Sequence, residues 1–184
     1  KIVKTLNRAL SLANGEYIAR MDGDDISAPD RIEKKLRFLE ENKEFDLVGC
    51  SMVTIDSDGV EMGKTQRLSD FELIKRTLKY VSPVSHIWLA RKKVYDKLDG
   101  YREMPGAEDY DFLLRMISSD MKCTNLTDYY GYYVRLGREG NTVSTNGLYQ
   151  RKMHYYIYKL YEERVAKGYD SFTTDENIKS SELS

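Results

Sequence analysis

Apolar residues recur every three or four positions in several stretches of the chain, which is the spacing of one helix face. In one such stretch Ile32, Leu36 and Leu39 form the predicted buried face. Ser27 is its predicted N-cap, and Asp30 lies three residues later, as in a capping box. The predicted helices cover residues 3–13, 28–42, 71–78, 93–98 and 149–165, with a further helix that opens at Glu108.

Shorter apolar runs lie between these helices and predict strands. They cover residues 17–21, 46–56, 85–90 and 122–135, and the last of these regions is rich in tyrosine. Residues 56–59, Asp-Ser-Asp-Gly, predict a hairpin turn after the second run. Helices that alternate with short buried strands indicate an α/β fold, and the hairpin predicts a mixed sheet.

The length of 184 residues suits one domain. The chain opens on a helix that leads directly into a predicted buried strand, whereas an α/β sheet normally has earlier strands. We therefore expect residues 1–168 to form part of a domain whose fold starts further upstream. From Tyr169 onward the composition turns polar, and residues 169–184 are predicted to be a disordered tail.

Charge and composition argue against several classes of protein. The net charge of −1 provides no excess of Lys and Arg for a nucleic-acid backbone. The charge-free residues 80–90 are too few for a membrane-spanning helix, which needs about 20 apolar residues. Cys50 and Cys123 lie far apart in apolar stretches, so we predict that both are reduced and buried, which suits the cytoplasm.

The first cluster of candidate chemistry is the acidic run Asp22-Gly23-Asp24-Asp25, which follows a predicted strand. Ligands of open α/β sheets bind at the carboxyl ends of strands. Three carboxylates this close repel one another unless a cation is present, and oxygen ligands suit Mg²⁺ or Mn²⁺. The alternative is an acidic surface turn that caps the next helix.

The second cluster is Glu108-Asp109-Tyr110-Asp111, which opens a predicted helix after a loop that contains Gly106. The helix dipole favours ionised carboxylates in the first turn, and a general base must be ionised and must face its substrate. Acidic residues are also ordinary in a first turn without any catalytic role, and the motif alone leaves both interpretations open.

Together these residues and their flanks resemble the bacterial family 2 glycosyltransferases. Residues 15–27, Gly-Glu-Tyr-Ile-Ala-Arg-Met-Asp-Gly-Asp-Asp-Ile-Ser, carry the resemblance together with Pro29 and Arg31. Later matches follow in the family's order, namely Gly100-Tyr101-Arg102, Glu108-Asp109-Tyr110-Asp111, Leu114-Arg115 and Asn141-Thr142-Val143-Ser144. The resemblance covers about residues 1–165, and two ordered acidic motifs are far more specific than either motif alone.

The resemblance implies a GT-A-like (Rossmann-like) mixed sheet flanked by helices. It also implies the inverting transfer of a sugar from a nucleotide diphosphate sugar, foremost a UDP-sugar, to a hydroxyl acceptor. Asp22 and Asp24 are then the ligands of a Mn²⁺ or Mg²⁺ ion at the diphosphate, and Asp25 belongs to the same donor-binding cluster. Asp109 is the implied base that deprotonates the acceptor, with Glu108 orienting Asp109 or the acceptor.

Cationic side chains are the candidates for contacts with the diphosphate or the acceptor. Arg102 lies within a family motif and is predicted to bind the donor. His86 is either an acceptor contact or a structural hydrogen-bonding residue. The other cationic candidates are Arg135, Arg138 and Arg151.

Such bacterial relatives build capsular or other surface polysaccharides, which implies a saccharide or lipid-linked acceptor. We therefore expect a cytoplasmic enzyme that works at the inner face of the membrane. The helix predicted at 149–165 carries Arg151, Lys152, Lys159 and Arg164 opposite its apolar face. That helix could contact an anionic membrane peripherally or could pack on its own domain.

The chain departs from the family at its start. Family members begin with a strand, a helix and a strand that hold the nucleotide base, and we expect an N-terminally truncated domain without them. A haloacid dehalogenase-type phosphohydrolase is one alternative, with Asp22 as the nucleophile and Asp24 as the acid/base. Ile26 occupies the place where that class carries Thr. The other alternative is a non-catalytic fragment that binds a sugar or a partner through the tyrosines of residues 129–133.

Overall fold

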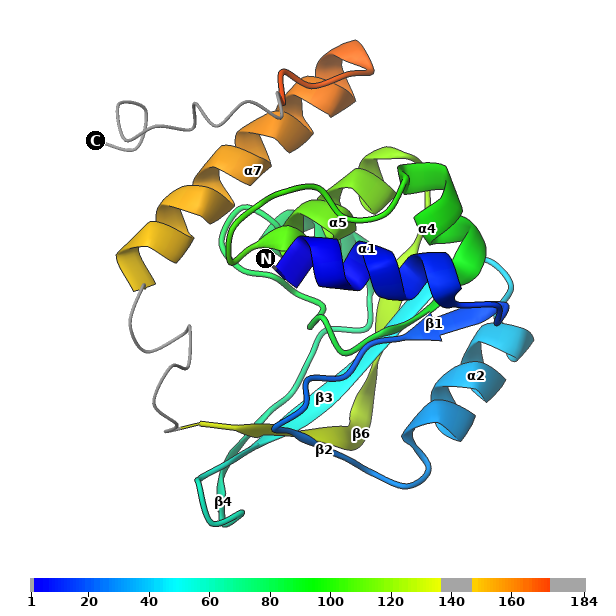
Figure 1. The fold of residues 1–184 in the computed structure, drawn as a ribbon, viewed down its shortest axis with the longest axis vertical. Helices are drawn as coiled ribbons and strands as arrows, with labels where there is room; N and C mark the ends of the chain where they lie inside the picture. Colours follow the sequence, from blue (N-terminus) through cyan, green and yellow to red (C-terminus); the bar gives the residue numbers. More distant parts are fainter. Residues whose placement is uncertain (1, 137–146, 173–184) are drawn as a thin grey trace.

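The computed structural model describes residues 2–136 and 147–172. These residues form one mixed sheet with helices on both sides (Figure 1). The strands are β1 (Tyr17–Ala19), β2 (Ile26–Ser27), β3 (Leu47–Ile55), β4 (Glu61–Thr65), β5 (Leu89–Arg91) and β6 (Cys123–Arg135). The helices are α1 (Ile2–Leu12), α2 (Arg31–Glu41), α3 (Phe71–Thr77), α4 (Lys92–Leu98), α5 (Glu108–Ser118) and α7 (Gly147–Lys167).

The sheet has the strand order β1-β5-β3-β6-β2, and β4 pairs with β3 outside this path. β3 and β6 run parallel, whereas the other pairs are antiparallel. The predicted mixed sheet and the predicted hairpin at residues 56–59 are therefore confirmed. The β3–β6 pairing extends from Leu47 with Cys123 to Ile55 with Arg135, and a register shift occurs near Ser51.

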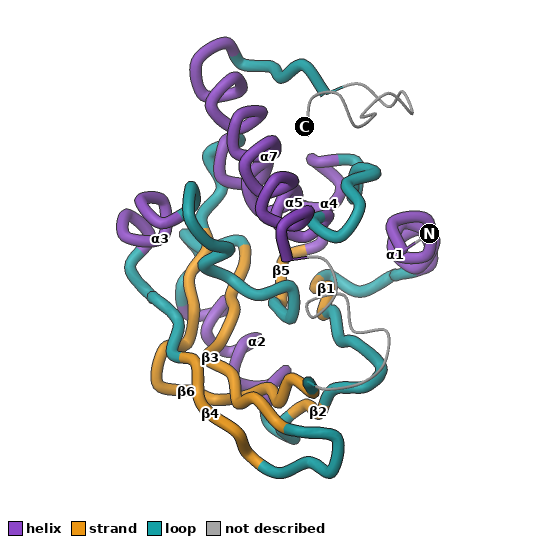
Figure 2. Tube along the Cα trace, turned by 90° about the vertical axis from the view of Figure 1, so that its left-hand side faces the viewer, coloured by secondary structure: helices purple, strands orange, loops and turns teal. Residues whose placement is uncertain are grey.

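Alternation along the central strands separates two cores. Leu47 and Ala90 belong to a large cluster with α4, α5 and α7, whereas their neighbours Val48 and Leu89 pack with Leu39 of α2. Successive residues of a strand point to opposite faces, so one sheet serves both cores. Figure 1 shows α2 on one side of the sheet and α1, α4 and α5 on the other, with α7 outside α5, and Figure 2 gives the perpendicular view.

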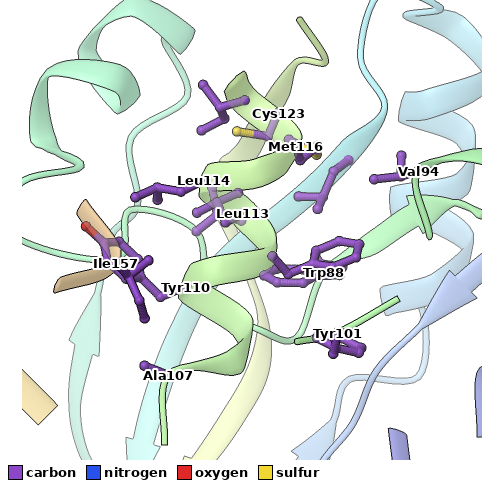
Figure 3. Close-up of a cluster of buried hydrophobic side chains, with 14 of the residues drawn as sticks. Trp88, Val94, Tyr101, Ala107, Tyr110, Leu113, Leu114, Met116, Cys123 and Ile157 are labelled. Carbon is purple, nitrogen blue, oxygen red and sulfur yellow. The ribbon is translucent and has the colours of Figure 1, made fainter. Parts of the chain in front are cut away.

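The larger core surrounds α5, as Figure 3 shows. The predicted apolar face of this helix is buried, including Tyr110 and Leu114. Trp88 stacks on Phe112 with a ring-centroid distance of 5.7 Å, and its indole N–H donates to the Tyr95 hydroxyl at 2.8 Å. This packing fixes the N-terminus of α5, which carries the second acidic motif.

The start of α2 differs from the prediction, because the helix begins at Arg31 rather than just after Ser27. Ser27 is not its N-cap, and Asp30 at the cap position makes no side-chain capping hydrogen bond. Ile26 and Ser27 instead form β2 and pair with β6, so sheet pairing replaces the predicted capping box. The Ser27 hydroxyl accepts a hydrogen bond from Nε of Arg31 at 2.8 Å.

The predicted buried face of α2 was also wrong in part. Ile32 and Leu36 are exposed, and the buried residues are Arg31, Lys35 and Leu39. Two long cationic side chains therefore turn inward where the apolar spacing predicted isoleucine and leucine. Both cations donate hydrogen bonds to the backbone carbonyl of Ile87, and this shared acceptor explains why the two side chains are buried.

Two predicted strands are shorter than expected. β1 is half-buried rather than buried, because it pairs only with β5 at the end of the described sheet. β5 begins at Leu89, so His86 lies in the segment before the strand. The free cysteines Cys50 and Cys123 are buried, as predicted.

The long helix α7 packs its buried residues Met153, Ile157 and Leu160 into the core, which confirms packing against its own domain. Among the described residues, no helix has the length and apolar character needed to cross a bilayer. The predicted polar loop at 137–145 lies outside the described residues. The boundary between residues 168 and 169 stays a prediction, while Asp170 makes ion pairs with Arg102 and Arg164.

Candidate functional site

The acidic loop after β1 is held in place by β6. The backbone N–H of Asp22 donates to the Tyr132 hydroxyl at 3.0 Å, and the Asp25 carboxylate accepts from the backbone N–H of Arg135 at 2.8 Å. These contacts follow from the pairing of β2 with β6, which brings the loop beside Tyr132. Burial is the main cause that raises the pKa of Asp25. The loop therefore presents Asp22 and Asp25 toward the end of the sheet.

His86 lies between the two acidic motifs. Its Nε2 is 2.9 Å from Oδ2 of Asp22, and its Nδ1 is 3.8 Å from Oδ2 of Asp109. The Nε2 atom is buried and pairs with the carboxylate of Asp22. Burial opposes the charged imidazole, but the two carboxylates outweigh it and raise the pKa of His86. His86 is also the main cause that lowers the pKa of Asp22.

Arg20 joins the two acidic motifs from the other side. Its Nη1 is 3.1 Å from Oε1 of Glu108, and its Nε is 3.6 Å from Oδ1 of Asp22. The Arg20 side chain is 10% exposed, so this contact is largely screened from solvent. Glu108 is buried, whereas Asp109 beside it is partly exposed and reachable. Residues far apart in the chain therefore form one acidic site around one guanidinium.

The remaining predicted site residues lie around this centre in different ways. Asp24 is exposed, and its backbone carbonyl accepts from Nε of Arg135 at 3.0 Å. Arg102 forms ion pairs with the buried Asp111 and with Asp170, so the structure engages its guanidinium outside the acidic centre. Arg151 is exposed, and Arg138 lies outside the described residues.

A divalent cation fits the residues that converge here. Asp22, Asp25 and His86 each offer one ligand atom, and these atoms lie within 4.8 Å of one another. Asp22 and Asp25 supply carboxylate oxygens, which are the ligands that Mg²⁺ and Mn²⁺ take in proteins. The carboxylates Asp22, Asp25, Glu108 and Asp109 outnumber the guanidinium of Arg20 that lies among them. Excess negative charge of this kind favours a bound cation.

Sequence reasoning missed Arg20 as a site residue and did not place His86 between the motifs. Arg20 stands two positions before Asp22, and residues at this spacing share a side of an extended chain, which is a signal for the contact. His86 carries no such local signal, because the segment that holds it meets Asp22 and Asp109 only through the fold.

The model of the family described as Glycosyl transferase family 2 matches residues 2–99. The putative glycosyltransferase EpsE of Bacillus subtilis is 33% identical over 132 residues, which are 70% of this chain and 46% of the relative. The amylovoran biosynthesis glycosyltransferase AmsE of Erwinia amylovora is 32% identical over 126 residues, which are 68% of this chain and 47% of the relative. The chain thus spans less than half the length of these relatives.

Solved structures share the fold. TarS 1–349 of S. aureus, in complex with UDP-GlcNAc, superposes with a TM-score of 0.65 at 20% identity, covering 91% of this chain and 47% of TarS. The mannosyltransferase PcManGT of Pyrobaculum calidifontis, in complex with GDP-Man and Mn²⁺, superposes with a TM-score of 0.55 at 16% identity, covering 83% of this chain and 41% of that enzyme. The predicted GT-A-like sheet is therefore confirmed.

Proposed function

This chain belongs to glycosyl transferase family 2, and we propose that it carries out metal-dependent, inverting transfer of a sugar from a nucleotide diphosphate sugar to a hydroxyl acceptor. The observation that carries the proposal is the meeting of the two acidic motifs, which Arg20 contacts from one side and His86 from the other. A transferase of this kind needs donor-binding and acceptor-activating groups within reach of one reacting carbon.

The donor side of the proposed site is the acidic loop. Asp22 and Asp25 converge with His86, and Asp24 on the exposed side of the same loop is a further candidate ligand. A bound Mn²⁺ or Mg²⁺ would neutralise the charge that grows on the leaving diphosphate. Tyr132 holds the backbone of Asp22, so the loop is oriented before any donor arrives.

The acceptor side is the N-terminus of α5. Asp109 is partly exposed, and as the base it takes the proton of the acceptor hydroxyl while that oxygen attacks the anomeric carbon. The attack comes from the face opposite the leaving diphosphate, so the configuration inverts. Glu108 is fixed by Arg20 and orients Asp109 or the acceptor.

The relatives suggest the biological setting. One relative is named for amylovoran biosynthesis and another, WbnJ of Escherichia coli, for O-antigen biosynthesis, so we propose surface polysaccharide synthesis. The acceptor is then a saccharide or a lipid-linked saccharide, and the donor foremost a UDP-sugar. We propose that the reaction takes place in the cytoplasm at the inner face of the membrane, where the exposed cations Arg151 and Lys159 of α7 would face anionic lipid.

The test separates donor binding from catalysis. Calorimetry measures the affinity for UDP and for GDP with Mn²⁺ and then with EDTA, and nucleotide release from a set of UDP- and GDP-sugars measures turnover. The substitution Asp109→Asn should lower turnover by about 10²–10⁴-fold and should keep nucleotide affinity. Asp22→Asn should lose cation-dependent nucleotide binding.

The control is Asp58→Asn, which removes an exposed carboxylate from the β3–β4 turn and should change neither measurement. Unchanged turnover in Asp109→Asn would remove the proposed base. Absence of both nucleotide binding and turnover across the whole donor set would contradict the transferase function for this chain. Release of phosphate from an aryl phosphate would point to the phosphohydrolase alternative instead.

A further inference from the structure

The segment that follows α7 turns back where the helix ends (Figure 1). We propose that Asp170 in this segment is a positioning residue, which fixes the first turn of α5 and thereby the proposed base Asp109. The connection is a chain of ion pairs that runs from Asp170 through Arg102 to Asp111. The catalytic meaning of this inference rests on the proposed function, but the fixing of the turn is measurable without a donor.

The first step is that the backbone after α7 is held in a defined turn. Gly168 has a φ of +83°, a left-handed conformation that favours glycine, and its N–H donates to the carbonyl of Arg164 at 2.9 Å. The N–H of Ser171 then donates to the carboxylate of Glu163 at 2.7 Å, which ties the segment to the side of the helix. The backbone on both sides of Asp170 is therefore fixed relative to α7.

The second step is that the carboxylate of Asp170 joins two guanidinium groups. Its Oδ2 lies 2.9 Å from Nη1 of Arg102, and it also pairs with Arg164 of α7. The Asp170 side chain is only 9% exposed. Burial opposes the ionised carboxylate, but the two guanidinium groups outweigh it and lower the pKa of Asp170. An ionised Asp170 therefore anchors Arg102 to the end of α7.

The third step is that Arg102 connects this anchor to the first turn of α5. Its Nε donates to Oδ2 of Asp111 at 3.1 Å, and Asp111 is fully buried. Arg115, one turn further along α5, donates to the same oxygen from its Nε at 2.9 Å. Arg102 itself lies in the loop before α5. One guanidinium therefore joins this loop, the first turn of α5 and the segment after α7.

The fourth step is that this first turn depends on side-chain anchors. Ala107 stands at the N-cap position of α5 and has no side-chain oxygen that could accept from the free N–H groups of the turn. Asp109 and Asp111 are two residues apart, so their side chains point about 200° apart around the helix axis. Asp111 is held by Arg102 on one side of the turn, whereas Asp109 faces His86 on another. The anchor thus orients the base without occupying its reactive side.

Loss of the charge on Asp170 predicts a specific failure. Three guanidinium groups would then share the single carboxylate of Asp111, namely those of Arg102, Arg115 and Arg164. Like charges repel, so we expect Arg102 to move away and the turn to lose one support. A small displacement of a reacting group costs a large factor in rate. Nucleotide affinity should stay, because the proposed donor site is the acidic loop.

The test compares Asp170→Asn with the native chain by two measurements. Hydrogen exchange, followed by mass spectrometry without any donor, reports the opening of the turn. Peptides that cover residues 101–111 should exchange at least about fivefold faster in the variant, while peptides of β3 keep the native rate. Nucleotide release reports turnover, and kcat should fall by about 10–100-fold. The KM for the donor and the dissociation constant for UDP should stay within about twofold of the native values.

Two neighbouring carboxylates of α7 provide a second variant and its matched control. Glu163→Ala removes the acceptor of the Ser171 N–H and should speed exchange over residues 101–111 in the same direction as Asp170→Asn. Glu162→Ala removes a carboxylate that pairs with Lys159 at the surface and should change neither exchange nor kcat. Asp170→Glu keeps the charge and should restore most of both measurements. Circular dichroism verifies that each variant is folded at the assay temperature.

The outcomes separate this inference from the proposed function. Native exchange over residues 101–111 in Asp170→Asn would overturn the role of Asp170, and so would an equal acceleration in β3, because the effect would then be global. Native kcat together with faster exchange would remove its catalytic meaning. If turnover requires Asp109 but not Asp170, the transferase function stands without the anchor. Absence of turnover in the native chain would count against the proposed function, while exchange would still decide whether Asp170 fixes the turn.

Discussion

Lys35 of α2 is a lysine in the interior, and its burial makes a measurable prediction about stability. The side chain is fully buried, and its Nζ donates to the carbonyl of Ile87 at 2.7 Å. Burial is the main cause that lowers the pKa of Lys35 from 10.5 to about 8, with Arg31 adding repulsion and Cys50 acting in the opposite direction. The folded protein therefore carries a charge that its interior disfavours.

The magnitude follows from the shift in pKa. Each pKa unit corresponds to about 1.4 kcal/mol, so protonated Lys35 lowers the free energy of unfolding by about 3 kcal/mol at pH 7. Between the folded pKa of about 8 and the unfolded value of 10.5, the unfolded chain binds more protons, so stability rises with pH. Above the unfolded pKa of 10.5 the burial of Lys35 costs no stability, because the amine is neutral in both states. This stability is lost as the pH falls through the folded pKa of about 8.

The perturbation is Lys35→Met, which keeps the length of the side chain and removes the charge. Arg31 still satisfies the carbonyl of Ile87. The variant should exceed the native chain in stability by up to about 3 kcal/mol at pH 7 and by about 1 kcal/mol at pH 10. Urea unfolding, followed by the fluorescence of the single tryptophan Trp88, measures both differences.

The control is Lys34→Met on the same helix, because Lys34 is half-buried and its ammonium reaches the surface, where it pairs with Asp30 and lies over the ring of Tyr129. Its effect should remain within about 1 kcal/mol, with little change between the two pH values. If Lys35→Met destabilised the protein equally at both pH values, the protonated amine would be a stabilising group, and the reasoning from burial would be refuted.

Three further substitutions test the site and the core. Arg20→Gln removes the group that contacts both acidic motifs, so kcat should fall more than KM rises in the donor turnover assay, and an equal effect on both would contradict a positioning role. Gly49→Ala would bring a methyl group to 2.1 Å from Oδ1 of Asn125, and the loss of stability on urea unfolding should be about 1–3 kcal/mol. Arg102→Gln leaves the buried Asp111 with Arg115 as its partner and should lower stability by about 2 kcal/mol, whereas a loss of UDP affinity at native stability would restore Arg102 to donor binding.

Much of the fold was predictable because its signals are local. The helices α1, α5 and α7 and the strand β3 lie within one or two residues of the expected bounds, since each carries a clear apolar period. The turn at residues 56–59 predicted the hairpin for a similar reason. The parallel pairing of β3 with β6 has no local signal, because it joins segments that are far apart in the chain.

The site was predictable in its parts but not in its assembly. Both acidic motifs stood out in the sequence, and the family resemblance supplied roles for Asp22 and Asp109. Their common contacts with His86 and Arg20 depend on tertiary structure. The contact of Arg102 with Asp170 likewise joins the loop before α5 to the segment after α7, and no spacing in the sequence predicts it.

The misassigned positions lie together, and this pattern argues for a functional cause. Ser27 lies in a strand rather than at a helix cap, and Lys35 is buried in place of Leu36. His86 lies before its predicted strand. All three residues lie next to the acidic loop or the carbonyl of Ile87. Local preferences fail most often where a protein maintains strained or costly arrangements for a site. Lys35 lowers stability by its burial, and it holds the backbone next to His86, which faces the carboxylates of Asp22 and Asp109. This combination fits a loss of stability that is kept for the sake of the site. If Lys35→Met stabilises the fold while it lowers turnover, the same side chain will have been shown to exchange stability for the geometry of the site.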